Sequence, residues 1–358
     1  MDSSLKGKYV LSFKSNCYES EMYMSDANVR IGLIGAGRIG IVHSGSIVDT
    51  KGADLVWVCD PFVENAERLG QQYGAKVSAD PLEVINSGEI DAILIASPTP
   101  THVDLINAGL DAGLHIMCEK PIDLDIARVE SLRDKANNSG KIVSLGFNRR
   151  YHPEFEEINR RVLAGEIGKL EQLVITSRDP GPAPRAYIAV SGGIFRDMTI
   201  HDFDMARYFI PKIVEVSAVG ANSFSDDIKA ENDFDSVTVT MKGANEEIVT
   251  IINSRRAVYG YDQRLEAFGS DGMLIASNAT PTNVRHYNKV VAESANSYID
   301  NFLDLYAIAY RRELALFVEA VRTGVQTTPT FDDGRAALIL ADAATESART
   351  GKAVKVNV

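Results

Sequence analysis

The run "VRIGLIGAGRIG" at residues 29–40 is the stretch that most constrains the fold. Residues 29–35 form a short and mostly apolar segment, which is typical of a strand buried on both faces of a parallel sheet. Glycines at 35, 37 and 40 follow, and residues 36–49 have helical spacing. A strand, a glycine-rich turn and a helix in that order predict the opening unit of a parallel α/β sheet.

The same alternation continues to residue 147. We expect further buried strands at residues 53–60, 91–99, 114–121 and 141–147, with helices between them at 64–74, 101–113 and 123–140. Thr101 is the expected N-cap of one helix, and Gly74 and Gly113 are expected just past two helix ends. Strand and helix repeat about every 25–30 residues, which predicts a Rossmann-type, doubly wound parallel sheet.

The pattern changes after residue 147. A helix is expected at residues 151–168 and a strand at 169–179, followed by a loop rich in proline and glycine. Strand-like runs with turn signals extend from about 213 to 291, and two long helical patterns close the chain at 302–323 and 332–350. This favours a second, α+β domain with a large, mostly antiparallel open sheet. We therefore expect domains at residues 28–147 and 148–358.

Residues 1–27 do not fit either domain. Their apolar runs are too short for a signal-peptide core, and no small-residue cleavage pattern follows. We expect an extension without a fold of its own, or an annotated start upstream of the natural one at Met22 or Met24. The mass of the native protein would decide between these two possibilities.

The composition excludes several classes of protein. The 358 residues are 45% hydrophobic and 24% charged, and the net charge is −12 without a run of Lys or Arg. Nucleic acid and anionic membrane surfaces are therefore not expected partners. The three cysteines are scattered and form no CxxC pair, and no histidine or acidic cluster has metal-ligand spacing, so we expect no metal. A reducing cytoplasm fits this cysteine usage.

The glycine motif also predicts a ligand. In the pattern Gly35-x-Gly37-x-x-Gly40, the first glycine permits the tight turn, the second lets a pyrophosphate approach the backbone, and the third lets helix and strand pack closely. Asp60 lies 20 positions further on, at the end of the second strand, where a carboxylate binds ribose hydroxyls and repels a 2′-phosphate. The motif therefore predicts NAD rather than NADP, with Arg38 and Ile39 of the loop also at the cofactor. The alternative is a plain turn beside a surface aspartate.

Polar side chains follow two other strands at the edge where open α/β sheets bind ligands. "MCEKP" places Glu119 and Lys120 there, and "ASPTPTH" adds Thr99 and His102. An ammonium at Lys120 could stabilise an alkoxide or relay its proton. We expect Glu119, Thr99 and His102 at the cofactor, with His102 bonded to backbone or ribose rather than catalytic.

"SGGIFRDMTIHDFDMARY" at residues 191–208 carries the remaining polar cluster. On a continuous helix, Asp197 and His201 would share one face, because residues four apart lie one turn apart. Asp202 and Asp204 would lie on other faces, at the surface or behind the site. A solvated helix face or a core histidine is the alternative to a catalytic pair.

With these motifs in this order, the chain resembles the glucose–fructose oxidoreductase / inositol dehydrogenase family from residue 29 to the C-terminus. The "GGIFRDMTIHDFDMARY", "NRRYHPEF" and "SRRAVYGYDQR" segments are similar to those of bacterial inositol 2-dehydrogenases. The resemblance implies a catalytic trio of Lys120, Asp197 and His201. It also implies NAD-dependent oxidation of myo-inositol at the 2-hydroxyl to scyllo-inosose, and a homotetramer built through the second sheet.

A polyol substrate requires several fixed donors and acceptors. The candidates are Arg149, Arg150, Asp179, Tyr259 and Tyr261, and the resemblance favours Arg150 and Asp179. The two tyrosines are expected on one face of a strand. The remaining histidines have no partner spacing and are expected to be structural: His43, His115, His152 and His286.

Two other functions stay open. The chain could oxidise another cyclitol or an aldose, such as scyllo-inositol or D-glucose. It could also be a sugar-responsive regulator that binds dinucleotide without turnover, although such a protein would have no need of Lys120, Asp197 and His201 together.

Overall fold

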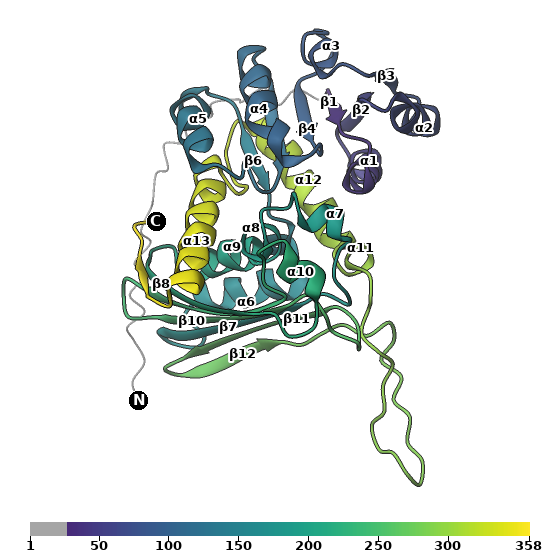
Figure 1. The fold of residues 1–358 in the computed structure, drawn as a ribbon. Coiled ribbons are helices and arrows are strands. Elements are labelled where there is room, and N and C mark those ends of the chain that lie inside the picture. Colours follow the sequence, from purple (N-terminus) through teal and green to yellow (C-terminus); the bar gives the residue numbers. More distant parts are fainter. Residues whose placement is uncertain (1–26) are drawn as a thin grey trace, which may run out of the picture.

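The computed structural model describes residues 27–358, and the predicted extension and its alternative starts at Met22 and Met24 lie outside these residues. Two sheets form two layers, with helices packed between them (Figure 1). No helix among residues 27–358 is long and apolar enough to span a membrane.

The first sheet has the strand order β3-β2-β1-β4-β5-β6, and every neighbouring pair is parallel. This is the order of a dinucleotide-binding Rossmann sheet, which confirms the predicted fold class. Its strands are β1 Val29–Ile34, β2 Ala53–Cys59, β3 Lys76–Ser78, β4 Ala92–Ile95, β5 His115–Glu119 and β6 Val143–Gly146. Its helices are α1 Arg38–Asp49, α2 Val63–Tyr73, α3 Pro81–Ile85, η1 Thr99–Thr101, α4 His102–Asp111 and α5 Ile126–Asn138.

The second sheet has the order β12-β11-β7-β10-β9-β8-β13 and is antiparallel except between β7 and β10. Its strands are β7 Leu170–Arg178, β8 Ile213–Ala221, β9 Ser236–Gly243, β10 Ile248–Ser254, β11 Asp262–Gly269, β12 Gly272–Ala276 and β13 Val354–Lys355. The helical segments of this part are η2 Asn148–Tyr151, α6 Pro153–Leu163, α7 Arg185–Ile188, α8 Ile194–Asp197, α9 Ile200–Phe209, α10 Asp226–Ala230, α11 Phe302–Leu305, α12 Ala307–Thr323 and α13 Phe331–Thr350. The mostly antiparallel open sheet is therefore also confirmed.

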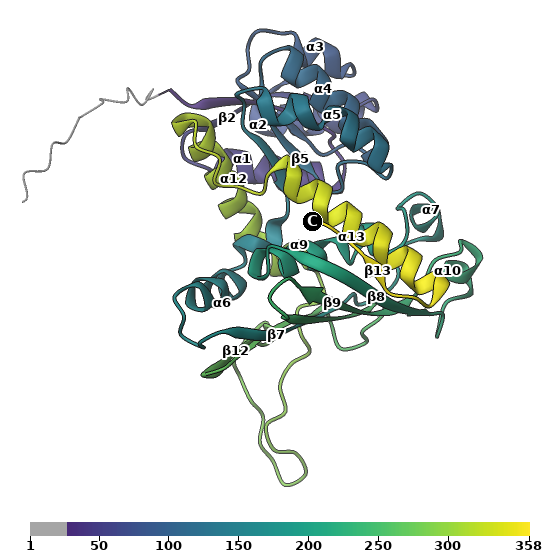
Figure 2. The same cartoon turned by 90° about the vertical axis from the view of Figure 1, so that its left-hand side faces the viewer.

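The two long C-terminal helices, α12 and α13, pack against the first sheet, and α13 also packs against the second. α13 lies between the sheets, where it contacts β6 and α5 of the first layer and β8 of the second (Figure 2). α12 packs its buried residues Leu314, Phe317 and Val318 into the core of the first sheet. α12 comes after residue 147 in the sequence but packs with the first sheet. The domain boundary near residue 147 therefore stays a prediction.

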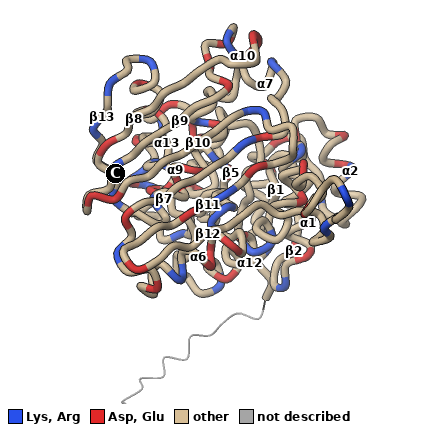
Figure 3. Tube along the Cα trace, turned by 90° about the horizontal axis from the view of Figure 1, so that it is seen from below, with Lys and Arg blue, Asp and Glu red and all other residues tan. Residues whose placement is uncertain are grey.

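The helices α6, α9 and α13 cover one face of the second sheet, and the opposite face carries no helix among the described residues (Figures 1 and 2). Exposed apolar side chains lie on its strands, among them Val219, Phe268, Met273 and Ile275. Strands were expected to about residue 291, but β12 ends at Ala276, and an extended loop with one isolated bridge follows (Figure 1). Acidic and basic residues are interspersed along the trace in Figure 3.

Glu313 is fully buried on α12, and neither of its carboxylate oxygens has a protein partner. Burial, together with the negative charges of Glu119 and Asp204, raises its pKa well above the ordinary value. A carboxyl group whose pKa is raised by folding favours the folded state at low pH. That stability is lost as the pH rises above the unfolded pKa of about 4.3 toward the folded value.

We expect Glu313→Gln to be about 1–3 kcal/mol more stable than the parent protein at pH 8, since the amide has no charge to bury. The gain should shrink toward zero near pH 5. Urea unfolding at both pH values measures it, with Glu319→Gln on the exposed side of α12 as the control. An equal effect of Glu313→Gln at both pH values would contradict this account.

Candidate active site

The glycine loop between β1 and α1 forms an open cradle. Gly35 has a φ of +103°, and a Cβ at Gly40 would lie 2.0 Å from the Gly35 carbonyl oxygen. At Gly37, the N-cap of α1, a Cβ would meet nothing within 4 Å, and no side chain caps the helix. The first N–H groups of α1 are thus left for an anionic ligand, as a bound pyrophosphate requires.

Asp60 lies beside this cradle, at the end of β2. Its Oδ2 accepts a hydrogen bond from the Ala36 backbone at 2.8 Å, and its Oδ1 accepts one from Phe62 at 2.9 Å. A carboxylate can accept about four hydrogen bonds, so ribose hydroxyls can share these oxygens. Arg38 at the loop places its guanidinium over the ring of Phe302, 5.1 Å from the centroid. The residues present therefore fit an NAD molecule.

Lys120 follows β5 at the carboxyl edge of the first sheet. Its ammonium donates to the Asp197 carbonyl oxygen at 2.6 Å and lies 3.7 Å from Asp197 Oδ1. The preceding Glu119 accepts from the Lys120 backbone N–H at 3.3 Å. Lys120 is thus held across the gap between the first sheet and α8.

Glu119 and His43 form a buried pair behind this lysine. His43 Nε2 and Glu119 Oε1 lie 2.7 Å apart, and the His43 ring is fully buried in α1. Burial alone would raise the pKa of Glu119, but the bond to His43 and the charge of Lys120 hold it below its ordinary value. Glu119 was predicted at the cofactor. Its carboxylate joins His43 of α1 to the Lys120 backbone, and its contact with the cofactor stays a prediction. His43, predicted to be structural, contacts the side chain of Glu119, the residue that precedes Lys120.

His102 was also predicted to contact backbone or cofactor. Its two ring nitrogens lie 2.8 Å from the carbonyl oxygens of Pro121 and Ser97, so the ring joins the loops after β4 and β5. This fits the backbone role, and it leaves no ring nitrogen for a cofactor. Thr101 is the N-cap residue of α4, as predicted, but its hydroxyl donates to the Pro98 carbonyl oxygen and makes no capping hydrogen bond to the helix. Thr99 begins η1 and is half-buried, and its contact with cofactor stays a prediction.

The segment around Asp197 and His201 is not one helix. α8 ends at Asp197, and α9 begins at Ile200, because the Thr199 N–H bonds to Ile194 five residues back and interrupts the regular ladder. The one-turn spacing predicted for Asp197 and His201 is therefore wrong. The two side chains lie on successive short helices that both face Lys120.

His201 is half-buried, and its Nδ1 is a buried atom without a protein partner in the described chain. Its ring stands edge-on to Phe147, with centroids 6.2 Å apart. Burial first, and then the positive charges of Lys120 and Arg149, lower its pKa well below the ordinary value. The imidazole is thus neutral at physiological pH and can accept a proton.

Asp197 has three side-chain neighbours. Tyr187 of α7 donates its hydroxyl to Asp197 Oδ1 at 2.8 Å, and Arg255 donates to Oδ2 at 3.1 Å. Lys120 completes the set at 3.7 Å from Oδ1. The carboxylate therefore lies next to two cations and one phenol.

Asp202 and Asp204 were expected at the surface or behind the site, and both are fully buried. Asp202 accepts from the Arg149 guanidinium, from Ser177 at 2.7 Å and from Asn253 at 2.8 Å. The surface alternative is wrong, because α9 is enclosed between η2 and the second sheet. Asp202 supports the site by fixing Arg149.

Arg150 was predicted to bind substrate. Its guanidinium is bonded to both carboxylate oxygens of Asp204 and lies 3.2 Å from Asp333 of α13. The geometry does not support substrate binding, since these donors are bound to Asp204 of α9 and Asp333 of α13. Of these two arginines, Arg149 is the one whose positive charge helps to lower the pKa of His201, so it lies nearer to that imidazole.

Asp179 and Tyr261 lie together at the end of β7. The Tyr261 hydroxyl bonds to Asp179, and Asp179 Oδ1 is buried without a protein partner. Burial raises the pKa of Asp179 to about 6, and the neighbouring charge of Asp197 adds to this shift. Asp179 therefore lies near Asp197, and Tyr261 adjoins Asp179. Their binding of substrate stays a prediction.

Tyr259 does not join them. Its hydroxyl donates to Asp262 at 2.7 Å and accepts from Arg178 at 2.8 Å. β11 begins only at Asp262, and Gly260 between the tyrosines has a φ of +111°. The predicted shared strand face is therefore wrong, because the turn directs Tyr259 away from Tyr261.

No group of three or more His, Cys, Asp or Glu side chains with the geometry of a metal site occurs in residues 27–358. A dinucleotide cradle beside a lysine, a carboxylate and a neutral histidine defines a class of protein, the dinucleotide-dependent oxidoreductases.

Comparison with known proteins gives the family. Residues 29–147 match the oxidoreductase family with an NAD-binding Rossmann fold, and residues 155–275 match the GFO/IDH/MocA C-terminal domain. The chain is 41% identical over 335 residues to the inositol 2-dehydrogenase of Rhizobium meliloti (strain 1021), covering 92% of this chain and 99% of that one. The chain belongs to the GFO/IDH/MocA oxidoreductase family, and its first domain binds NAD.

Solved structures agree with this assignment. The crystal structure of a myo-inositol dehydrogenase from Corynebacterium glutamicum ATCC 13032 superposes with a TM-score of 0.90 at 53% identity, over 92% of this chain and 99% of that one. A scyllo-inositol dehydrogenase from Lactobacillus casei, with bound NAD(H) and scyllo-inositol, gives a TM-score of 0.84 at 27% identity, over 92% and 99% of the chains.

Proposed function

We propose that this protein oxidises myo-inositol at the 2-hydroxyl to scyllo-inosose with NAD. The observation that carries the proposal is the meeting of Lys120, Asp197 and His201 at the carboxyl edge of β5. Lys120 lies within 4 Å of Asp197 Oδ1, and its charge lowers the pKa of His201. The relatedness to proteins named inositol 2-dehydrogenase supports the choice of substrate.

His201 serves as the general base in this proposal. Bound NAD supplies the hydride acceptor. The neutral imidazole takes the proton of the reacting hydroxyl as the hydride leaves its carbon, and burial keeps that imidazole uncharged before the reaction. The products are one carbonyl group, one reduced cofactor and one proton, which His201 later releases.

Lys120 acts on the same oxygen, and Asp197 supports Lys120. The Lys120 ammonium donates a hydrogen bond that stabilises the negative charge developing on the oxygen. Asp197 holds Lys120 through its carboxylate and its backbone carbonyl, and it can accept a hydrogen bond from an adjacent substrate hydroxyl.

The remaining hydroxyls of a polyol need ligands of both kinds. Asp179 offers a buried oxygen without a protein partner, and Tyr261 and Arg149 lie next to it. Because the pKa of Asp179 is about 6, the carboxylate that accepts substrate hydroxyls is formed above that pH. We infer that substrate affinity rises between about pH 5 and 7.

The preference for NAD rests on Asp60. We expect Asp60→Ala to weaken NAD binding by about 10- to 100-fold, because hydrogen bonds to a charged group are lost. NADP binding should improve, since no carboxylate repels its 2′-phosphate. Quenching of Trp57, the single tryptophan, measures both affinities, with Asp54→Ala on the same strand as the control. Unchanged affinities for both cofactors would contradict this role.

We further propose that the protein works in inositol catabolism in the cytoplasm, as a homotetramer formed through the second sheet. The exposed apolar residues on the helix-free face of that sheet support this association, as apolar patches mark interfaces. Sedimentation equilibrium would measure the mass of the assembly.

NADH fluorescence with a panel of polyols tests the proposed function. At alkaline pH we expect the highest kcat/KM with myo-inositol, and lower values with scyllo-inositol and D-glucose. A higher kcat/KM for another polyol would make that polyol, and not myo-inositol, the preferred substrate. The absence of NADH formation with every polyol would favour a regulator that binds dinucleotide without turnover.

A further inference from the structure

Arg255 is a fully buried arginine that the proposed mechanism does not use. It follows the end of β10 and is 1% exposed. Its Nη1 donates to Asp197 Oδ2 at 3.1 Å, and its Nη2 donates to Asp233 Oδ2 at 3.2 Å. The guanidinium therefore bridges two carboxylates, which compensates the cost of burying its charge.

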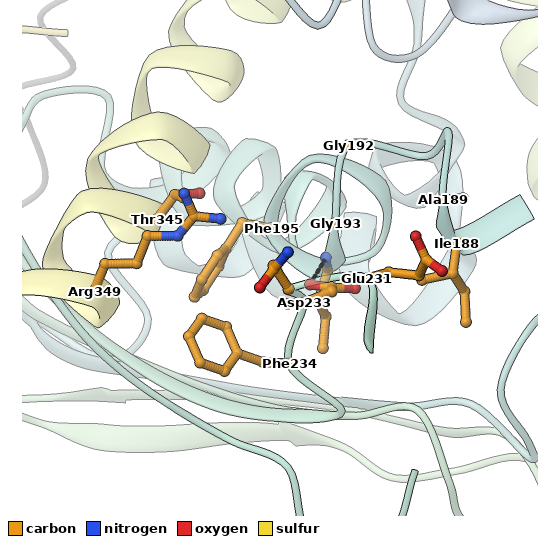
Figure 4. Close-up of a pocket in the computed structure, with 12 residues that line it drawn as sticks. Ile188, Ala189, Gly192, Gly193, Phe195, Glu231, Asp233, Phe234, Thr345 and Arg349 are labelled. Carbon is orange, nitrogen blue, oxygen red and sulfur yellow. Dashed lines mark hydrogen bonds between the residues drawn. The ribbon is translucent and has the colours of Figure 1, made fainter. Parts of the chain in front are cut away.

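Asp233 is itself fixed to the start of α8. Its Oδ1 accepts the Ile194 N–H at 2.8 Å, and a Cβ at Gly193 would lie 2.9 Å from the same oxygen. Figure 4 shows Asp233 beneath this turn, at the wall of a cavity of about 160 Å³. Ile194 begins α8 and Asp197 ends it. The path from Asp233 through Arg255 to Asp197 thus braces the short helix from one end to the other.

The contact with Arg255 also gives the two carboxylate oxygens of Asp197 different partners. Oδ2 is taken by Arg255, and Oδ1 is left for Tyr187 and Lys120. Arg255 and Lys120 are the two cations within ion-pair distance of this carboxylate in the described chain. Without Arg255, the Asp197 carboxylate would be free to turn and pair with Lys120 alone. The ammonium would then be drawn away from the substrate oxygen.

We propose that Arg255, held by Asp233, is a positioning residue that fixes the orientation of the Asp197 carboxylate and so keeps Lys120 available to the substrate. This inference rests on the proposed oxidation of myo-inositol. The bridge needs a planar fork with two donors, which lysine does not provide.

The experiment compares Arg255→Met and Arg255→Lys with the parent protein. Turnover of myo-inositol is expressed per NADH-binding site, counted by fluorescence titration, so that unfolded protein does not enter the rate. We expect Arg255→Met to lower kcat about 100-fold, the cost of a misplacement near 1 Å, with NADH affinity within about twofold. Arg255→Lys should lose about tenfold. Arg256→Met is the matched control, since that neighbour is exposed and lies over Phe224.

Asp233→Asn keeps an oxygen for the Ile194 N–H and removes only the charge partner of Arg255. It should lower turnover per site about tenfold. If Arg255→Met does not fold, this variant tests the proposal in its place. With myo-inositol deuterated at C2, the isotope effect on kcat should be at least as large in these variants as in the parent, because the hydride step is slowed. Turnover per site within threefold of the parent in Arg255→Lys and Asp233→Asn would overturn the proposal. An inactive parent protein would instead refute the proposed substrate.

Discussion

His201→Ala is expected to lower kcat with myo-inositol by about a thousandfold to ten-thousandfold, while NAD still binds. The imidazole is neutral because of its surroundings, and its Nδ1 has no protein partner in the described chain. Removal of the base therefore leaves water as the proton acceptor. Steady-state rates and NADH titration measure turnover and cofactor binding separately.

Lys120→Ala should have an effect of similar size, since the group that stabilises the developing alkoxide is lost. The matched controls are His286→Ala in the extended loop and Lys51→Ala between α1 and β2, both at exposed positions. Each control should keep turnover within about twofold. Near-parental turnover of His201→Ala or Lys120→Ala would refute the assigned chemistry.

Gly40→Ala should abolish NAD binding and also destabilise the fold. A Cβ there would lie 2.0 Å from the Gly35 carbonyl oxygen. Because that oxygen belongs to the backbone, strand and helix would have to separate. We expect a loss of about 2 kcal/mol or more in the free energy of unfolding and no measurable NADH fluorescence transfer. Thermal unfolding and titration report the two effects.

Gly37→Ala provides a contrast, because a Cβ at this position meets nothing within 4 Å. It should fold normally but bind NAD weakly, since the pyrophosphate must approach the backbone there. Gly45→Ala, further along α1, should bind NAD normally and gain up to about 1 kcal/mol from helix propensity. Equal NAD affinity in all three variants would show that the loop is not the phosphate site.

The sequence was sufficient for the fold because its strongest signals are local. The apolar runs and the glycine turn at residues 29–40 predict a parallel strand and its helix, and β1 and α1 follow them closely. The break between α8 and α9 has no such signal. It results from the Thr199 N–H reaching Ile194, while Asp197 is held by Arg255 and Lys120, residues distant in the sequence.

The choice between adjacent arginines shows the same limit. In "NRR", nothing local distinguishes Arg149 from Arg150, and only the packing of α9 gives Asp202 to the first and Asp204 to the second. Likewise, "SRR" does not reveal that Arg255 is buried and Arg256 exposed. Sequence motifs thus locate the chemistry, whereas the partners of each charged group depend on tertiary contacts.

The transfer of deuterium from myo-inositol labelled at C2 to the cofactor tests the central claim most directly. With purified protein and NAD, mass spectrometry should find one deuterium in the NADH formed, and scyllo-inosose as the product. Unlabelled NADH together with an oxidised inositol would show that hydride leaves another carbon, and it would contradict oxidation at the 2-hydroxyl.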